Sequence, residues 1–113
     1  MADVYPVTTH DFEHLRGDTF QRVINVGMDL TGYTLVMQVR ETEDASKVLG
    51  MPEITVGVYD AATSKTQIVI ELAGAASQKW PEACVYDIEA RQGDYRRTLV
   101  RGSMNVIPDV TRL

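Results

Sequence analysis

The segment HDFEH at positions 10–14 is the part of the sequence with the most suggestive chemistry, because it carries two histidines four residues apart. On a helix, that spacing places both imidazoles on one face, where they can bind a single zinc ion as in metalloproteases. Gly17 follows almost at once, so no helix of the necessary length fits. On a strand, His10 and His14 lie about 13 Å apart, too far for two metal bonds of about 2 Å. We therefore expect a polar strand that enters a turn, and a metalloenzyme using His10 or His14 is the weakest hypothesis.

Cys84 is the only cysteine, so an intramolecular disulfide is impossible. A nucleophilic cysteine needs a lowered pKa and a nearby base. Cys84 instead lies on the same apolar parity as Tyr86 and Ile88, and no histidine is close in the sequence. We expect a buried structural cysteine. No serine lies in a nucleophile elbow and the glycines lack phosphate-loop spacing, so we predict a protein that is not an enzyme and binds no metal or other cofactor.

Four arginines surround a predicted hairpin near the end of the chain: Arg91, Arg96, Arg97 and Arg101. Arginine forms planar, bidentate contacts with carboxylates, so this group is a possible contact for an acidic partner. The alternative is a hairpin whose charges are simply solvated. With a three-residue turn, Glu89 would face Arg97 across the strands in an exposed ion pair that adds little stability.

Composition limits the possible classes of protein. The chain has 113 residues, which is about one domain, with 44% hydrophobic and 24% charged residues. Its net charge of -5 argues against nucleic acid as the main partner, because phosphate binding needs a basic surface. The segment 1–7 has no apolar run like that of a signal peptide, and no stretch reaches the roughly 20 apolar residues of a membrane span. We therefore expect a protein made in a cytoplasm, with no membrane partner.

Alternating apolar and polar residues dominate the sequence, as expected for half-buried strands. Four segments alternate cleanly, with their apolar residues on one parity: 33–40, 54–58, 67–72 and 84–91. A further strand is expected at 19–26 from its β-branched residues. Segments 95–100 and 104–107 complete the set, with Gly102 between them as a bulge or bend.

Turn signals separate these strands at positions 16–18, 31–32, 60–62 and 92–94. Only the segment 73–80 indicates a helix, of about two turns, which Pro81 ends. The polar segment 41–51 is expected to be a loop. About seven short strands and one short helix predict a single all-β domain spanning residues 1–113, an immunoglobulin-like antiparallel β-sandwich, with a small β-barrel as the alternative.

Several stretches in this order resemble one family of proteins. They are Gly17-Asp18-Thr19-Phe20, Gly32-Tyr33-Thr34-Leu35, Ile70-Glu71-Leu72, Trp80-Pro81, Val85-Tyr86-Asp87-Ile88-Glu89, the Gly93 hairpin, Gly102 and the ending from Val106 to Arg112. The pattern is similar to small bacteriophage and prophage structural proteins, and to the N-terminal sandwich domain of upper baseplate and tail-fibre attachment proteins. Glu82-Ala83-Cys84 departs from the family pattern, which has a glycine before the tyrosine strand. The resemblance implies a β-sandwich that acts in a virion or its assembly, and implies no catalytic residues.

The leading hypothesis is therefore a non-enzymatic phage structural or assembly module, associated with a tail or baseplate and acting through protein–protein contacts. Its expected partners are other phage structural proteins or further copies of itself, in the bacterial host cytoplasm during assembly and then in the virion. The alternative is a carbohydrate- or ligand-binding sandwich that uses Trp80 as a stacking platform. We expect Trp80 instead to close one end of the core.

Overall fold

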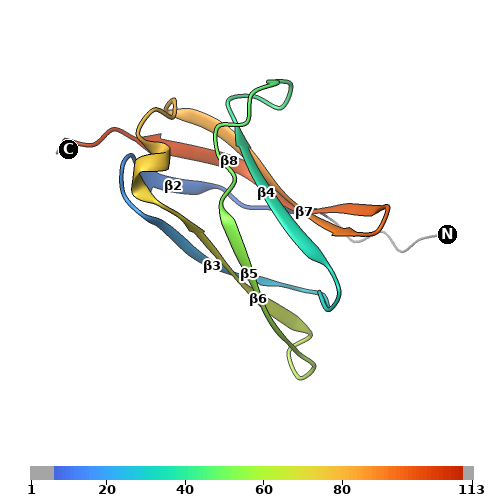
Figure 1. Ribbon diagram of the computed structural model, residues 1–113. Helices are drawn as coiled ribbons and strands as arrows, with labels where there is room; N and C mark the ends of the chain where they lie inside the picture. Colours follow the sequence, from blue (N-terminus) through green and yellow to red (C-terminus); the bar gives the residue numbers. More distant parts are fainter. Residues whose placement is uncertain (1–6, 111–113) are drawn as a thin grey trace.

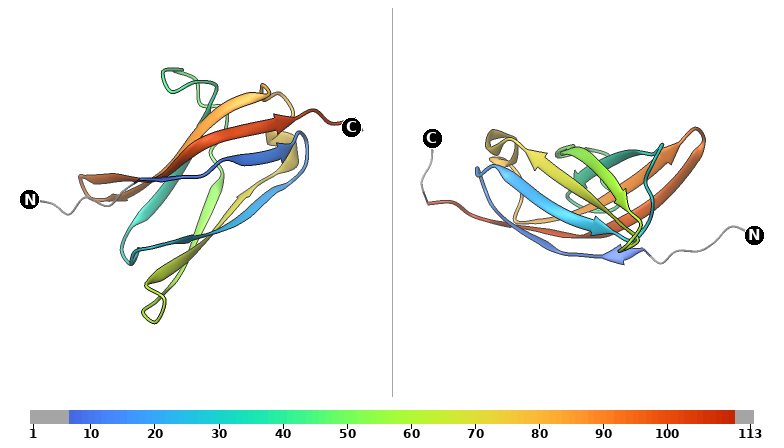
Figure 2. Two further views of the ribbon diagram at one scale, coloured as in Figure 1. Left: turned by 180° about the vertical axis from the view of Figure 1, so that it is seen from behind. Right: turned by 90° about the horizontal axis from the view of Figure 1, so that it is seen from below.

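The computed structural model describes residues 7–110, and two β-sheets pack face to face in it (Figures 1 and 2). The predictions about residues 1–6 and about the end of the family pattern at Arg112 lie outside the described residues. The elements in chain order are β1 (Thr8–Thr9), β2 (Phe12–Leu15), β3 (Phe20–Val26), β4 (Thr34–Arg40), β5 (Glu53–Asp60), β6 (Lys65–Leu72), the 3₁₀ helix η1 (Gly74–Ser77), β7 (Ala83–Gln92) and β8 (Tyr95–Ile107).

The strand order is that of an immunoglobulin-like sandwich. One sheet has the order β3-β6-β5, and the other runs β4-β7-β8 with β1 and β2 both paired to β8 in parallel. In an immunoglobulin domain strands B, E and D lie in one sheet, and strands C, F and G form the other. When β1 and β2 are counted together as strand A, β3-β6-β5 corresponds to B-E-D and β4-β7-β8 corresponds to C-F-G. The predicted immunoglobulin-like β-sandwich is therefore confirmed, and the barrel alternative is not found because the two sheets remain separate.

The alternating segments form strands, and their apolar parity faces the core as predicted. In β7 the inward residues Cys84, Tyr86, Ile88 and Ala90 are all buried. Met37 and Val39 of β4 and Ile68 and Ile70 of β6 are buried in the same cluster. The opposite parity of each strand points outward, since successive side chains of a strand alternate between faces. This alternation decides which charged residues share a surface.

The alternation of β5 is interrupted, which contradicts the predicted inward position of Val58. Ile54 and Val56 pack against the core, but the pairing of β5 with β6 shifts register between Val56 and Tyr59. This β-bulge reverses the parity of the strand. As a result Val58 is 92% exposed.

The predicted bulge or bend at Gly102 is wrong, because β8 runs from Tyr95 to Ile107 as one strand and the register shift in its pairing with β7 lies at Ile88–Glu89 instead. Gly102 pairs regularly with Tyr86 across the sheet. A Cβ atom at this position would overlap the carbonyl oxygen of His10. The glycine therefore permits the N-terminal strands to approach β8 closely.

The predicted helix is present but shorter than expected. It is a single 3₁₀ turn, Gly74–Ser77, rather than two turns of α-helix. Gly74 is packed against the backbone of Gly17, where a Cβ atom would overlap the carbonyl oxygen. This contact joins η1 to the turn between β2 and β3.

Two connections shape the surface of the five-stranded sheet. The β7–β8 hairpin turns on two residues, Gly93 and Asp94, with Gly93 at a φ of +57° that favours glycine. It projects beyond the rest of the sandwich (Figure 1). The segment 41–52 forms the predicted loop, and it is held to the edge of β4 by backbone hydrogen bonds from Val39 N–H to Gly50 and from Leu49 N–H to Val39. Among the described residues, no helix is long and apolar enough to cross a membrane.

Candidate functional site

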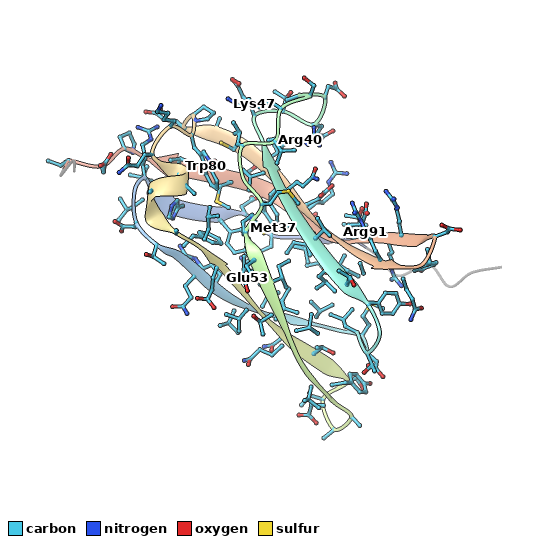
Figure 3. The ribbon with its side chains drawn as sticks, in the orientation of Figure 1. Met37, Arg40, Lys47, Glu53, Trp80 and Arg91 are labelled. Atoms are coloured by element: carbon cyan, nitrogen blue, oxygen red, sulfur yellow. The ribbon has the colours of Figure 1, made fainter. Side chains whose placement is uncertain are left out.

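The outward face of β4, β7 and β8, called here the β4–β7–β8 face, carries a polar hollow of about 420 Å³. Gln38 and Arg40 of β4, Asp87 of β7 and Arg101 of β8 line it. Glu43, from the loop 41–52, also lines the hollow, together with Asp11 from the connection between β1 and β2. Figure 3 shows Arg40 at the end of β4, beside the loop that carries Lys47.

Most charged groups of the hollow have partners within the molecule. Arg101 donates to Glu43 at 2.7 Å, and Arg40 donates to Gln38 at 2.8 Å and to the carbonyl oxygen of Ala45. Asp11 accepts a hydrogen bond of 2.9 Å from the backbone N–H of Ser103. These contacts hold the side chains of Arg101, Arg40 and Asp11 in place around the hollow.

Asp87 differs from its neighbours. Its carboxylate makes no hydrogen bond or ion pair within the part of the chain that the structure describes. Partial burial and the nearby charge of Glu89 raise the pKa of Asp87, and Arg101, Arg40 and Arg91 oppose this only in part. The guanidinium groups are directed to other acceptors, so Asp87 remains an acceptor without a donor.

The four arginines predicted as a partner contact do not form one cluster. Arg91 of β7 and Arg96 of β8 are directly opposite each other on the β4–β7–β8 face, beside the hairpin turn. Arg101 lies on the same face at the hollow, opposite Asp87. Arg97 is opposite the buried Ala90, so it extends from the other face of the hairpin. The partner contact itself stays a prediction.

The predicted pairing of Glu89 with Arg97 is wrong. A two-residue turn and a bulge at Ile88–Glu89 set the register, and Glu89 is opposite Thr98 instead. Glu89 forms an ion pair of 2.6 Å with Arg91, two residues along the same strand. The sequence does not reveal this bulge, which sets the residue of β8 that lies opposite Glu89.

The two histidines of the HDFEH segment have different environments. His14 is buried, and its Nε2 lies 2.9 Å from the hydroxyl oxygen of Ser77 in η1. Burial, and then the charge of Arg22, lower the pKa of His14, while Asp18 opposes the shift. His10 is exposed and packs edge-on against Phe12 with 4.7 Å between the ring centroids. In residues 7–110 no three histidine, cysteine, aspartate or glutamate side chains form a group that could hold a metal ion.

Two further candidates belong to the core. Cys84 is buried as predicted, and burial raises the pKa of its thiol to about 11, which opposes formation of a nucleophilic thiolate. Trp80 is 3% exposed and donates from its indole N–H to the carbonyl oxygen of Leu49. The predicted core position of Trp80 is confirmed, and a ring this deeply buried has no free face for stacking on a sugar.

Comparisons with known proteins show no family. No family model matches the chain, and no curated protein matches it. Among solved structures, it is similar to a chain from a photo-crosslinking study of multimeric cell-adhesive interactions of VGSC beta subunits, with 11% identity over 95% of this chain and 98% of that chain, and a TM-score of 0.43. A likeness at that level carries no functional argument, so the description of the site depends on its own geometry.

Proposed function

We propose that this chain is a non-catalytic structural or assembly module of a bacteriophage, associated with a tail or baseplate, that acts through protein–protein contacts. The family resemblance of the sequence motivates the phage assignment. In this proposal the protein is made in the bacterial host cytoplasm and is incorporated into the virion. Its β4–β7–β8 face is the surface that contacts a neighbouring protein.

The observation that carries the contact is the pair of arginines at the hairpin. Arg91 and Arg96 are opposite each other on adjacent strands, an arrangement that is unfavourable for two like charges. Within the described residues Arg96 forms no ion pair, and it is exposed. Arg91 is paired with Glu89 at 2.6 Å, so the guanidinium of Arg96 is the one that can pair with a carboxylate of a partner, beside the positive charge of Arg91.

Quantitative mass spectrometry of purified particles tests the proposal. A phage or prophage that lacks the gene is complemented with the wild-type chain or with the Arg91→Glu/Arg96→Glu double variant. We expect the wild-type protein in the particles at constant copy number, and the folded double variant to be depleted at least about tenfold.

Lys79→Glu is the matched control, because Lys79 is exposed and lies outside the strands of both sheets. This variant should be incorporated like the wild type. Particles that lack the wild-type protein would refute the virion role. Equal incorporation of the double variant would refute the proposed contact surface.

A further inference from the structure

The three-stranded sheet carries a like-charge pair of the opposite sign. Glu53 of β5 and Glu71 of β6 are directly opposite each other, and both are exposed on the outward face of that sheet. Among residues 7–110 neither glutamate forms an ion pair. Like charges in this arrangement destabilise a sheet, so one molecule presents an arginine pair on one sheet and a glutamate pair on the other. Figure 3 shows Arg91 and Glu53 on these two different sheets.

The rows of residues beside the two pairs differ in character. Next to the glutamate pair, Val69 lies between Val23 and Thr55, and Val23 is 56% exposed. Next to the arginine pair, the adjacent row runs Val36, Glu89 and Thr98, and its central Glu89 forms the ion pair of 2.6 Å with Arg91. Within residues 7–110, Arg96 on one face and the glutamate pair on the other are therefore charges of opposite sign that have no ion-pair partner.

We infer that the occupant of the β4–β7–β8 face is a second copy of this chain, whose Glu53 and Glu71 contact Arg91 and Arg96. This inference rests on the proposed function, because it uses the same arginine face, and it identifies the partner. The contact joins two different surfaces, so it is heterologous. Heterologous contacts close into rings when the rotation between copies allows it and otherwise extend into filaments.

Charge reversal on one face at a time tests this contact with the purified full chain. Sedimentation equilibrium at low salt is expected to show the mass of the wild-type protein rising with concentration. Arg96→Glu and Glu71→Arg should each weaken self-association at least about tenfold, because each places like charges in the contact. An equimolar mixture of the two variants should regain association, since each reversed face then meets its opposite on the other variant.

Lys79→Glu and Glu82→Lys are the controls, because both residues are exposed and lie outside the two faces. Both variants should associate like the wild type, and circular dichroism with thermal unfolding should show that all variants fold. A wild-type monomer at every concentration, or a mixture that does not recover, would overturn the inference. A closed dimer that Glu71→Arg leaves unchanged would also overturn it.

The two proposals fail in different ways. A monomeric wild-type protein that is still incorporated into particles overturns self-association and leaves the phage role intact. A self-associating protein that is absent from particles overturns the phage role, while the charge-reversal result still supports the contact between copies.

Discussion

Asp87 lines the hollow, where its carboxylate has no donor among the described residues and its pKa is raised, mainly by partial burial. Because the pKa is higher in the folded state than in the unfolded chain, the ionised form disfavours folding at neutral pH. This penalty shrinks as the pH falls through the raised pKa and is gone below the ordinary pKa of an aspartate. We predict that Asp87→Asn increases the free energy of unfolding by only about 0.3 kcal/mol at neutral pH, since water screens an exposed carboxylate.

Urea denaturation of both proteins at neutral pH and at about pH 3 measures this difference. The advantage of Asp87→Asn should vanish at the lower pH, where Asp87 is also neutral in the wild type. Glu82→Gln is the control, because Glu82 is exposed and immediately precedes β7. It should change the free energy of unfolding little at either pH. A less stable Asp87→Asn variant at neutral pH would contradict the prediction.

His14 gives the fold a pH dependence of the opposite sense. Its pKa is lowered from 6.5 in the folded state, mainly by burial, so the unfolded chain binds more protons below that pH. Wild-type stability should therefore fall as the pH drops below 6.5. We predict that His14→Gln, which retains a polar group near Ser77, costs about 1–3 kcal/mol at neutral pH.

The difference between the wild type and His14→Gln should become smaller from about pH 7 to about pH 5, as protonation penalises only the histidine protein. Denaturation midpoints across this range provide the measurement. Parallel stability curves for the two proteins would mean that His14 does not titrate differently on folding.

At the scale of elements, patterning within one strand was predictable and registry between strands was not. The alternation in 84–91 predicts β7 and its buried face, because it depends only on consecutive residues. The hollow instead depends on distant segments, such as Glu43 and Arg101, which are 58 residues apart in the sequence and meet in an ion pair. A two-residue turn and a bulge at Ile88–Glu89 divide the arginines between two faces. Gly93-Asp94 is a sequence signal for a two-residue turn, whereas no residue in the sequence marks the bulge.

The bulge in β5 provides a direct test of this distinction. Simple alternation places Val56 and Val58 on the same inward face, whereas the structure leaves Val58 exposed. We predict that Val58→Lys changes the free energy of unfolding by less than about 0.5 kcal/mol. Val56→Lys should cost about 2 kcal/mol or more, because Val56 packs against the core. Chemical denaturation measures the free energy of unfolding of the two variants. Equal losses of stability would argue against the bulge.

Gly102 determines how the N-terminal strands join the five-stranded sheet. A side chain there would overlap the backbone of His10, which cannot move without breaking the parallel pairing of β1 with β8. We predict that Gly102→Ala destabilises the protein by about 1–3 kcal/mol and increases amide exchange in β1 and β2. Gly27→Ala is the matched control, since nothing lies within 4 Å of its added Cβ atom and it should be nearly neutral. Unchanged exchange in Gly102→Ala would show that the segment shifts without loss of pairing.

At the scale of the whole molecule, charge is divided unequally between the two sheets. The strands of the five-stranded sheet carry a net charge of +2, from five arginines and three carboxylates, although the whole chain carries -5. The strands of the three-stranded sheet carry -1, from three carboxylates, Arg22 and Lys65. The strands that carry Arg96 are thus net positive and those that carry Glu53 and Glu71 are net negative, which favours alignment of one copy on the next.

This arrangement predicts how association responds to salt and concentration. Exposed charges are screened over about 10 Å at 0.1 M salt and about 3 Å at 1 M, so we expect self-association at low salt to be strongly weakened at high salt. Because the two faces of a heterologous contact are different, each added copy leaves one face of each kind unoccupied until a ring closes. The mass measured by light scattering should therefore rise past that of a dimer as concentration increases. Association that saturates at a dimer, or that is indifferent to salt, would require an apolar or two-fold symmetric contact, which the separation of charge between the sheets does not provide.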